Sequence, residues 1–279
     1  MPGPTRSTAA RGYVRSPDEV PAFWQLGNLW RLAASGHLTG NALGLLDHVV
    51  TNAGGVQASH LHPSDEGLYV VSGQCTFNAA GEELVAGASS LVVVPRSTEQ
   101  AFTVDEPGTH LLNFCVPAGV ELLLALFAHP AKRYELPPEG VPLPPAQLVD
   151  LLSRDYGHIQ GIGGRPGVDR PTAERMVTRP TPNAVVPPYV ASAAASRRCW
   201  HDGQLWSVLA DRPRTDGGFS TFEITAPRGT GAPPHLFVGS GAFHYVLDGA
   251  IDFLIGGEVH GADKGDFVFG PRARRARGA

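Results

Sequence analysis

Cysteine is scarce in this chain. Three cysteines, Cys75, Cys115 and Cys199, occur in 279 residues, and no two of them have CxxC spacing. We therefore expect neither a disulfide framework nor a CxxC zinc site. Cys75 and Cys115 stand in apolar runs, where a buried thiol behaves as a small hydrophobic side chain. Reduced thiols are typical of the cytoplasm, which is the location that we expect.

Charge and long apolar runs are also in short supply. Charged residues make up 17% of the chain, and the net charge is −4. A field this weak does not attract nucleic acid or an anionic membrane, so we expect neither as a partner. No stretch reaches 18 consecutive apolar residues, and the first ten residues contain no apolar segment. We expect no membrane span and no export signal.

Glycine and proline are plentiful instead, with 34 and 25 residues. They separate short runs of β-branched and aromatic residues, for example at 69–72, 91–94 and 110–115. Short strands between frequent turns are typical of an all-β sandwich or barrel. Two helices are also predicted, at 119–128 and at 145–156, because these segments carry apolar residues at helical spacing or in a continuous run.

An internal repeat divides the sequence. Trp24-Gln-Leu-Gly-Asn-Leu-Trp30 recurs 176 positions later as Trp200-His-Asp-Gly-Gln-Leu-Trp206. The pairs with nearly the same shift are His60 and His235, Gly73 and Gly249, Gly81 and Gly257, and Pro95 and Pro271. We therefore predict two copies of one unit, over 13–128 and 190–279, separated by a helix and a Pro/Gly-rich linker over 129–189.

The second copy is shorter than the first. It stops eight residues after Pro271, whereas the first copy continues from Pro95 through further strand-like segments. We expect a barrel that is incomplete at its C-terminal end, with open strand edges. Such edges invite aggregation, so we expect the N-terminal segment of the same chain, or a second subunit, to cover them.

His60, His62 and Glu66 bring metal-ligating side chains together within seven residues. Residues two apart on a strand face the same side, so both imidazoles can aim at one point, and a turn through 63–65 can return Glu66 to it. Two imidazoles and one carboxylate suit a divalent first-row metal with open coordination positions. The alternative is two surface histidines beside a polar turn.

These residues also resemble a known family. His60-x-His62-x3-Glu66-x6-Gly73 is similar to the first cupin motif. Ser89-x5-Pro95-x-Ser97-x2-Gln100 is similar to the second, with serines at its two glycine positions and Gln100 in place of its last histidine. The repeated Trp-x2-Gly-x-Leu-Trp segment resembles the cupin branch that includes bacterial quercetin 2,3-dioxygenases. The fold implied is two tandem jelly-roll β-barrels with a few short helices between them, paired as a homodimer.

The resemblance also implies a metal site. One divalent transition metal (Fe, Mn, Ni, Co, Cu or Zn) would be held in the first barrel by His60, His62, Glu66 and Gln100. Glu66 could in addition act as the catalytic base. The amide of Gln100 should bind Cu and Zn more weakly than an imidazole would. The alternative is a barrel interior in which His60 and Glu66 are only hydrogen-bonded.

The second copy keeps only the first histidine of the motif, His235, because Phe237 and Ala242 stand at the next two ligand positions. His244 lies two residues beyond Ala242 and could face His235. The pair is a candidate vestigial metal site, and the alternative is two satisfied core or cleft groups.

Three functions fit this pattern. The first is a metal-dependent dioxygenase of the quercetinase type, which would use O2 and a flavonol-like or other enolisable aromatic substrate. The second is a non-catalytic protein that binds a metal or a small molecule, and the third is a cupin isomerase or decarboxylase that needs no O2. Among the other polar residues, we expect His48 to be a packed or edge residue of a strand, and Asp65 and Glu121 to be solvated.

Overall fold

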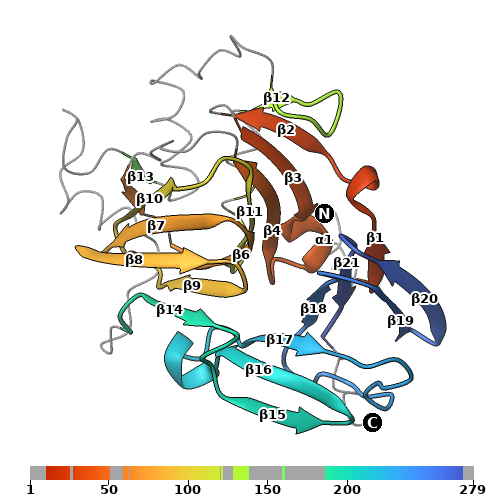
Figure 1. Ribbon diagram of the computed structural model, residues 1–279. Helices are drawn as coiled ribbons and strands as arrows, with labels where there is room; N and C mark the ends of the chain where they lie inside the picture. Colours follow the sequence, from red (N-terminus) through yellow and green to blue (C-terminus); the bar gives the residue numbers. More distant parts are fainter. Residues whose placement is uncertain are drawn as a thin grey trace, which may run out of the picture.

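The computed structural model describes residues 11–25, 28–50, 59–61, 63–119, 121, 128–137, 159–160 and 186–272. Strands form nearly all of its regular structure (Figure 1), which confirms the predicted all-β class. The predicted helix at 145–156 lies outside the described residues, as does most of the one at 119–128. None of the helices described is long and apolar enough to cross a membrane.

The elements follow one another in two series. The first series is β1 (Tyr13–Arg15), β2 (Ala22–Gln25), β3 (Asn28–Ala34), α1 (Gly36–Thr39), β4 (Gly44–Val50), β5 (His60–Leu61), β6 (Asp65–Ser72), β7 (Gln74–Ala79), β8 (Glu82–Gly87), β9 (Ser90–Val94), β10 (Gln100–Val104), β11 (Thr109–Val116), β12 (His129–Pro130) and β13 (Ile159–Gln160). The second is β14 (Tyr189–Ser192), β15 (Arg198–His201), β16 (Gln204–Ala210), β17 (Thr221–Thr225), β18 (Ala242–Tyr245), β19 (Ala250–Ile255), β20 (Glu258–Asp263) and β21 (Phe267–Gly270). Two 3₁₀ helices, Pro17–Glu19 and Arg212–Thr215, complete them.

Two antiparallel sheets form the first barrel. One has the strand order β12-β2-β3-β4-β11-β6-β9-β14, and the other has the order β13-β5-β10-β7-β8. The apolar core between them is made by Val50, Leu68, Val70, Cys75, Phe77, Ala79, Ala86, Val92, Val94, Phe102, Val104 and Leu111. Sheets closed over one core form the jelly roll that the sequence predicts.

The central strands of this barrel are buried on both faces. On β6, Leu68 and Val70 belong to the interior core, whereas Tyr69 belongs to a second cluster that includes Leu209, Phe267 and Phe269 of the second unit. Alternate residues of a strand point to opposite faces. Because the second unit covers the outer face, a continuous apolar run such as Leu91–Val94 is stable here.

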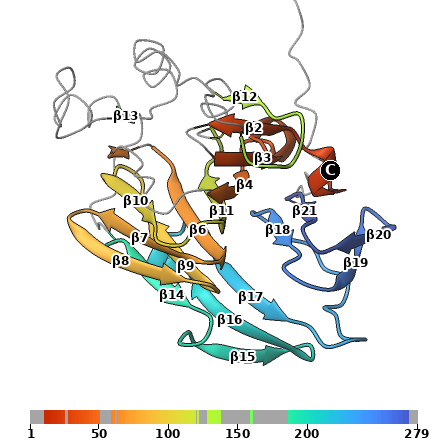
Figure 2. The ribbon, with the colours of Figure 1, turned by 45° about the horizontal axis from the view of Figure 1, so that its top comes forward.

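The second unit repeats several strands of the first at a constant shift. The strands β15, β16, β19 and β20 begin 176 positions after β2, β3, β7 and β8 respectively. The described strands here form three smaller sheets, with the orders β15-β16-β17, β1-β21-β18 and β19-β20 (Figure 2). In the first barrel β11 lies between β4 and β6, while the described residues of the second unit include no strand between β17 and β18.

Each unit contributes one strand to the other. Strand β1 pairs with β21, with Tyr13 opposite Phe269, and β14 pairs with β9, with Tyr189 opposite Val93. The two exchanged strands both begin Tyr-Val, 176 positions apart. Strand β1 thus covers β21 as β14 covers β9, while β17 and β18 each stand at the end of a sheet in the described part of the chain. The expectation that the N-terminal segment or a second subunit covers the edges left by the missing strands therefore stays a prediction. We propose that residues 13–128 and 190–279 form two separate units, each of which donates one strand to a sheet of the other.

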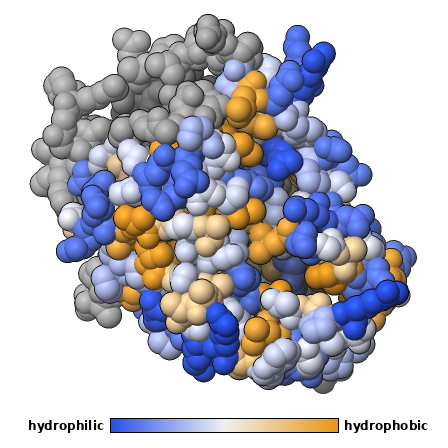
Figure 3. Space-filling view, viewed as in Figure 1, coloured by the Kyte–Doolittle hydropathy of each residue, from blue (hydrophilic) through white to orange (hydrophobic). Residues whose placement is uncertain are grey.

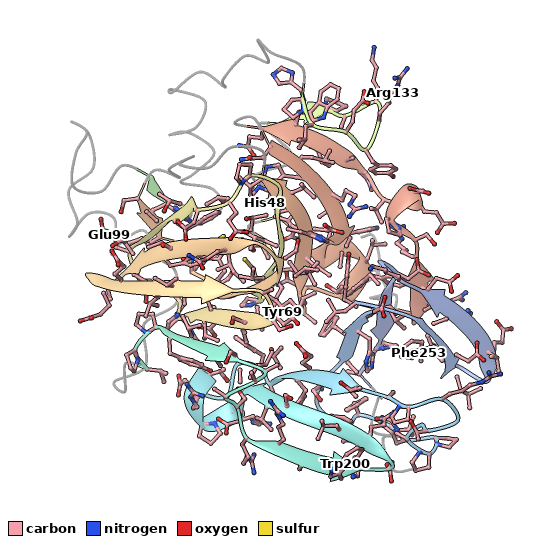
Figure 4. The ribbon with its side chains drawn as sticks, in the orientation of Figure 1. His48, Tyr69, Glu99, Arg133, Trp200 and Phe253 are labelled. Atoms are coloured by element: carbon pink, nitrogen blue, oxygen red, sulfur yellow. The ribbon has the colours of Figure 1, made fainter. Side chains whose placement is uncertain are left out.

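Polar contacts also join the two units. Asp47 on β4 accepts hydrogen bonds from Tyr245 on β18 at 2.9 Å, from Arg31, and from His110, whose Nε2 lies 2.6 Å from its Oδ1. Tyr69 donates to Glu223 on β17, and Figure 4 shows Tyr69 between the first barrel and the second unit. Burial alone would raise the pKa of Asp47, but His110, Arg31 and Tyr245 together hold that pKa below its ordinary value.

Candidate metal centre

His60 and Gln100 lie side by side on neighbouring strands of the smaller sheet. They are direct partners in the antiparallel pairing of β5 with β10, so their side chains share one face of the sheet. Both are buried. The residues just before them are also linked, because the Ser59 hydroxyl donates to Oε1 of Glu99 at 2.7 Å. Register and this contact hold the imidazole and the amide next to each other.

Glu66 reaches this pair from the opposite sheet. It lies on β6, is buried, and accepts a hydrogen bond from Nε2 of Gln100. Three of the four predicted ligands, His60, Glu66 and Gln100, are therefore brought together inside the first barrel. The fourth, His62, lies outside the described residues.

Asn113 is a functional candidate that the sequence reasoning missed. Its Nδ2 donates to Oε1 of Glu66 at 2.6 Å from the neighbouring strand β11. The two carboxylate oxygens of Glu66 thus accept from two different side-chain amides, which fixes the plane of the carboxylate. The available signal was a lone amide within the otherwise apolar strand 111–115.

Cys115 lies beside Glu66 across the same strand pair. Burial raises the pKa of its thiol well above the ordinary value, and the negative charges of Glu66, Glu121 and Asp65 raise it further. The side chain stays a neutral thiol near pH 7, which matches the expectation of a buried small hydrophobe.

Asp65 is not solvated, contrary to the prediction. It is 5% exposed, and both of its carboxylate oxygens bind the Arg96 guanidinium, at 3.0 and 2.9 Å. The backbone N–H of Arg96 also donates to it at 3.0 Å. Asp65 faces away from the barrel interior because alternate residues of a strand point to opposite sides. The turn between β9 and β10, which leads to Gln100, is thereby fixed to β6.

Glu121 is likewise buried, at 2% exposed, so that prediction was wrong too. Its carboxylate accepts from the backbone N–H groups of Gly36 at 2.9 Å and of Gly119 at 2.6 Å. A Cβ at Gly44 would lie 2.2 Å from Oε2 of Glu121, so a larger residue at the start of β4 would displace this carboxylate. The carboxylate thus satisfies two backbone N–H groups, one of which lies 85 residues away in the sequence. Sequence periodicity does not reveal such a contact.

The donor set suits a divalent metal by its chemistry, since it offers an imidazole, a carboxylate and an amide oxygen. Within the described part of the chain, no three His, Cys, Asp or Glu side chains gather as a metal cluster. Of the four predicted ligands, only His60 and Glu66 are both described and of these residue types, because His62 lies outside the described residues and Gln100 is an amide. The assignment of His60, His62, Glu66 and Gln100 as ligands therefore stays a prediction.

The candidate vestigial site in the second unit is more open. His235 is exposed and its Nδ1 lies 2.8 Å from the carbonyl oxygen of Pro233. His244 is partly buried on β18, and its pKa is lowered by burial and by the nearby His235. The role of these two imidazoles as a metal pair also stays a prediction.

The class of protein is defined by these observations: a duplicated jelly-roll fold whose first barrel holds a buried cluster of histidine, glutamate and amide side chains. The family model described as "Cupin domain" matches residues 47–115, which span β4 to β11. The first barrel thus matches the cupin domain, and the chain as a whole has the duplicated jelly-roll fold of a bicupin.

Individual relatives are more distant. Quercetin 2,3-dioxygenase of Bacillus subtilis (strain 168) is 24% identical over 245 residues, which cover 85% of this chain and 69% of that protein. Oxalate decarboxylase from Bacillus subtilis at pH 4.6 superposes with a TM-score of 0.59 and 14% identity, over 98% of this chain and 73% of that one. A structure of the same enzyme from work on its Mn(II) centres gives a TM-score of 0.59 and 14% identity, with 98% and 74% covered.

Proposed function

We propose that this chain is a metal-dependent cupin enzyme of the dioxygenase type, which uses O2 and a flavonol-like or other enolisable aromatic substrate in its first barrel. One observation carries the proposal: the buried Glu66 carboxylate meets Gln100, the register partner of His60, inside that barrel. The similarity to a quercetin 2,3-dioxygenase supports this choice of reaction.

The residues present fit a divalent ion. His60, His62, Glu66 and Gln100 would hold it, because nitrogen and oxygen donors of this mixture suit first-row divalent metals. When bound, the ion would supply Lewis acidity and a template that orients the substrate and O2. A metal with strong affinity for oxygen ligands is favoured over Cu and Zn, because an amide stands where an imidazole would complete the set.

Glu66 would act as the base. A carboxylate within hydrogen-bond reach of a substrate hydroxyl can take its proton and leave an electron-rich enolate or phenolate. Asn113 and Gln100 each donate to one carboxylate oxygen of Glu66, so the lone pairs that remain point in fixed directions. Asn113 is therefore a positioning residue that acts through Glu66, and Gln100 would both position Glu66 and hold the metal.

Apolar side chains surround this polar cluster. Leu68, Val92, Val94 and Phe102 are nearly inaccessible to solvent and belong to the interior core. A site lined by such side chains, with only a few polar groups, is typical of pockets for planar organic ligands. Exclusion of water also strengthens the electrostatic interactions inside the barrel.

The second candidate function is a reaction that needs no O2. The fold likeness to an oxalate decarboxylase favours it, because the same barrel can carry an isomerase or decarboxylase chemistry. A non-catalytic binding protein is the third candidate. All three require a ligand in the first barrel, and they differ in whether oxygen is consumed.

The decisive experiment measures metal content and oxygen uptake together. The full chain is loaded with Mn, Fe, Co or Ni, and oxygen consumption is followed with flavonols, β-diketones and catechols. Glu66→Gln should lower turnover by a factor of about 10² or more if Glu66 is the base. Glu83→Gln, an exposed position on β8, serves as the matched control and should leave turnover unchanged. Loaded protein that consumes no oxygen with any of these compounds contradicts the dioxygenase proposal.

The homodimer is also proposed. On the face shown in Figure 3, apolar patches interrupt a largely polar surface. Large apolar side chains exposed to solvent include Val85 on β8 and Leu254 and Val259 on β19 and β20. Apolar patches on a surface are typical of association sites. Sedimentation analysis of the full chain that gives only monomer would contradict this proposal.

A further inference from the structure

A fully buried histidine lies within the first barrel, away from the predicted ligands. His48 on β4 is 0% exposed and stacks on Trp30 of β3, with ring centroids 3.3 Å apart and an angle of 15° between the planes. Its ring is also edge-on to Phe102, with centroids 6.5 Å apart. Figure 4 shows His48 between the two sides of this barrel.

The polar atoms of this stacked pair are unsatisfied. Within the part of the chain that the structure describes, neither ring nitrogen of His48 has a hydrogen-bond partner, and nor does Nε1 of Trp30. Burial lowers the pKa of His48 to about 3, so its imidazole is neutral near pH 7. It offers one N–H donor and one nitrogen acceptor, and Trp30 adds a second donor. Folded proteins rarely leave three buried polar atoms together without a use for them.

The pair faces the same interior as the candidate metal centre. His48 lies opposite Leu111 on β11, and Leu111 belongs to the interior core. Asn113, two residues further along β11, faces the same side and donates to Glu66. Phe102, which contacts His48, is two residues from Gln100 on β10. The His48–Trp30 pair and the cluster around Glu66 therefore lie at successive levels of one barrel interior.

We propose that His48 and Trp30 form a distal subsite that binds a neutral hydroxyl or carbonyl group of the substrate, while its reacting end lies at Glu66. This inference rests on the proposed function for the location of the reacting end. A hydroxyl next to a carbonyl supplies one donor and two acceptors, which are the complements of the three unsatisfied atoms.

The charge of the surroundings sets the class of ligand. Among the described residues, the buried set includes no lysine and no arginine. A carboxylate placed at the distal subsite would lose its hydration with no cation to compensate. The subsite therefore selects neutral hydroxylated aromatic compounds over small dianions such as oxalate.

The test measures equilibrium binding of quercetin, catechol and oxalate to the metal-loaded full chain and to His48→Phe. Phenylalanine keeps the stacking area and removes both nitrogens. We expect His48→Phe to weaken quercetin binding about tenfold for each hydrogen bond lost, with unchanged metal content. His48→Gln, which retains a donor and an acceptor, should restore part of the affinity. Leu111→Met, opposite His48 but apolar, is the matched control and should bind quercetin as the parent protein does.

A second measurement does not depend on a variant. The imidazole ¹⁵N resonances of His48 should shift when quercetin or catechol binds, because a ring nitrogen gains a hydrogen bond. Unchanged resonances at saturation, or equal affinity of the parent and His48→Phe, would overturn the subsite. Failure of both neutral probes to bind would overturn it as well. A protein that binds quercetin through His48 but takes up no metal would contradict the proposed function and leave the subsite in place.

Discussion

Asp65 and Glu66 are neighbours on β6, yet their carboxylates serve opposite faces of the strand. Asp65 binds Arg96 on the side of the second unit, and Glu66 accepts from Gln100 and Asn113 in the barrel interior. Arg96 begins the turn that leads to Gln100, so one strand fixes the candidate base and the turn that carries its amide partner.

Removal of the Asp65 charge should destabilise the fold. In Asp65→Asn the Arg96 guanidinium stays largely buried, at 16% exposed, but loses its closer carboxylate and keeps only that of Asp216, at 4.0 Å. We expect a loss of about 3 kcal/mol in the free energy of unfolding, measured by urea denaturation. Asp248→Asn, which breaks an exposed pair with Lys264, should cost less than about 0.5 kcal/mol. Equal effects of the two changes would argue against a structural role for the Asp65–Arg96 pair.

Loss of the Asn113 amide should weaken the metal centre. Asn113→Ala removes one of the two amide donors on Glu66, and partners of metal ligands typically affect metal affinity by about 10-fold to 100-fold. We expect at least about tenfold weaker metal binding in competition with a chelator. Asn78→Ala, at an exposed position on β7, is the control. If both variants bind metal like the parent, Asn113 does not position a ligand.

His48 should make stability depend on pH. Its pKa of about 3 in the folded protein lies below the ordinary value of 6.5. As the pH falls through 6.5, the unfolded chain takes up a proton that the folded chain does not. Stability must therefore decrease toward acid, with a contribution of up to about 1.4 kcal/mol per pH unit.

Urea denaturation between about pH 7 and pH 4.5 should show that the free energy of unfolding of the parent falls toward acid. The slope against pH should be smaller for His48→Phe, by the amount that corresponds to the uptake of about one proton. Leu111→Met provides the control, because it removes no titratable group and should leave the slope unchanged. An identical slope in the His48→Phe variant would mean that His48 is protonated in the folded state.

The contact between Asp47 and Tyr245 should stabilise the docking of the two units. Tyr245→Phe removes a hydrogen bond to a buried carboxylate and should cost about 2 kcal/mol. The remaining partners keep the pKa of Asp47 low, so the stability that this carboxylate provides is present above its ordinary pKa of 3.8 and is lost as the pH falls through its lower pKa in the folded protein. Tyr134→Phe, which removes a bond to the carbonyl oxygen of Val20 at a 40%-exposed side chain, should have a smaller effect.

The exchanged strand β1 should be required by the second unit. Val14 packs on the small core formed by Val246, Ala262 and Val268. A charge introduced by Val14→Asp should destabilise the chain by about 3 kcal/mol, and amide hydrogen exchange should rise in β18 and β21. Arg11→Asp, just before the strand and exposed, should change neither quantity. Normal exchange in β21 of the Val14→Asp variant would show that β1 is dispensable.

Much of the architecture could be read from the chain. Turn residues and β-branched runs indicate the strands, and the 176-residue shift reproduces the starts of β15, β16, β19 and β20. The proximity of Glu66 and Gln100 was implied by the resemblance to the two cupin motifs, and the role of His60, Glu66 and Gln100 as ligands stays a prediction. Asp65 and Glu121 were misjudged because their burial depends on partners that are distant in sequence, Arg96 for the first and the N–H of Gly36 for the second.

The amino-acid sequence by itself determined the strand class, the duplication and the motif of the first barrel, since local periodicity and spacing encode them. Only the tertiary structure decided that β1 and β14 cross to the opposite unit, that Asn113 orients Glu66, and that His48 lies unsatisfied against Trp30. Strand pairing, hydrogen-bond partners and solvent exclusion arise from contacts between distant segments, and the local pattern of residues does not predict such contacts.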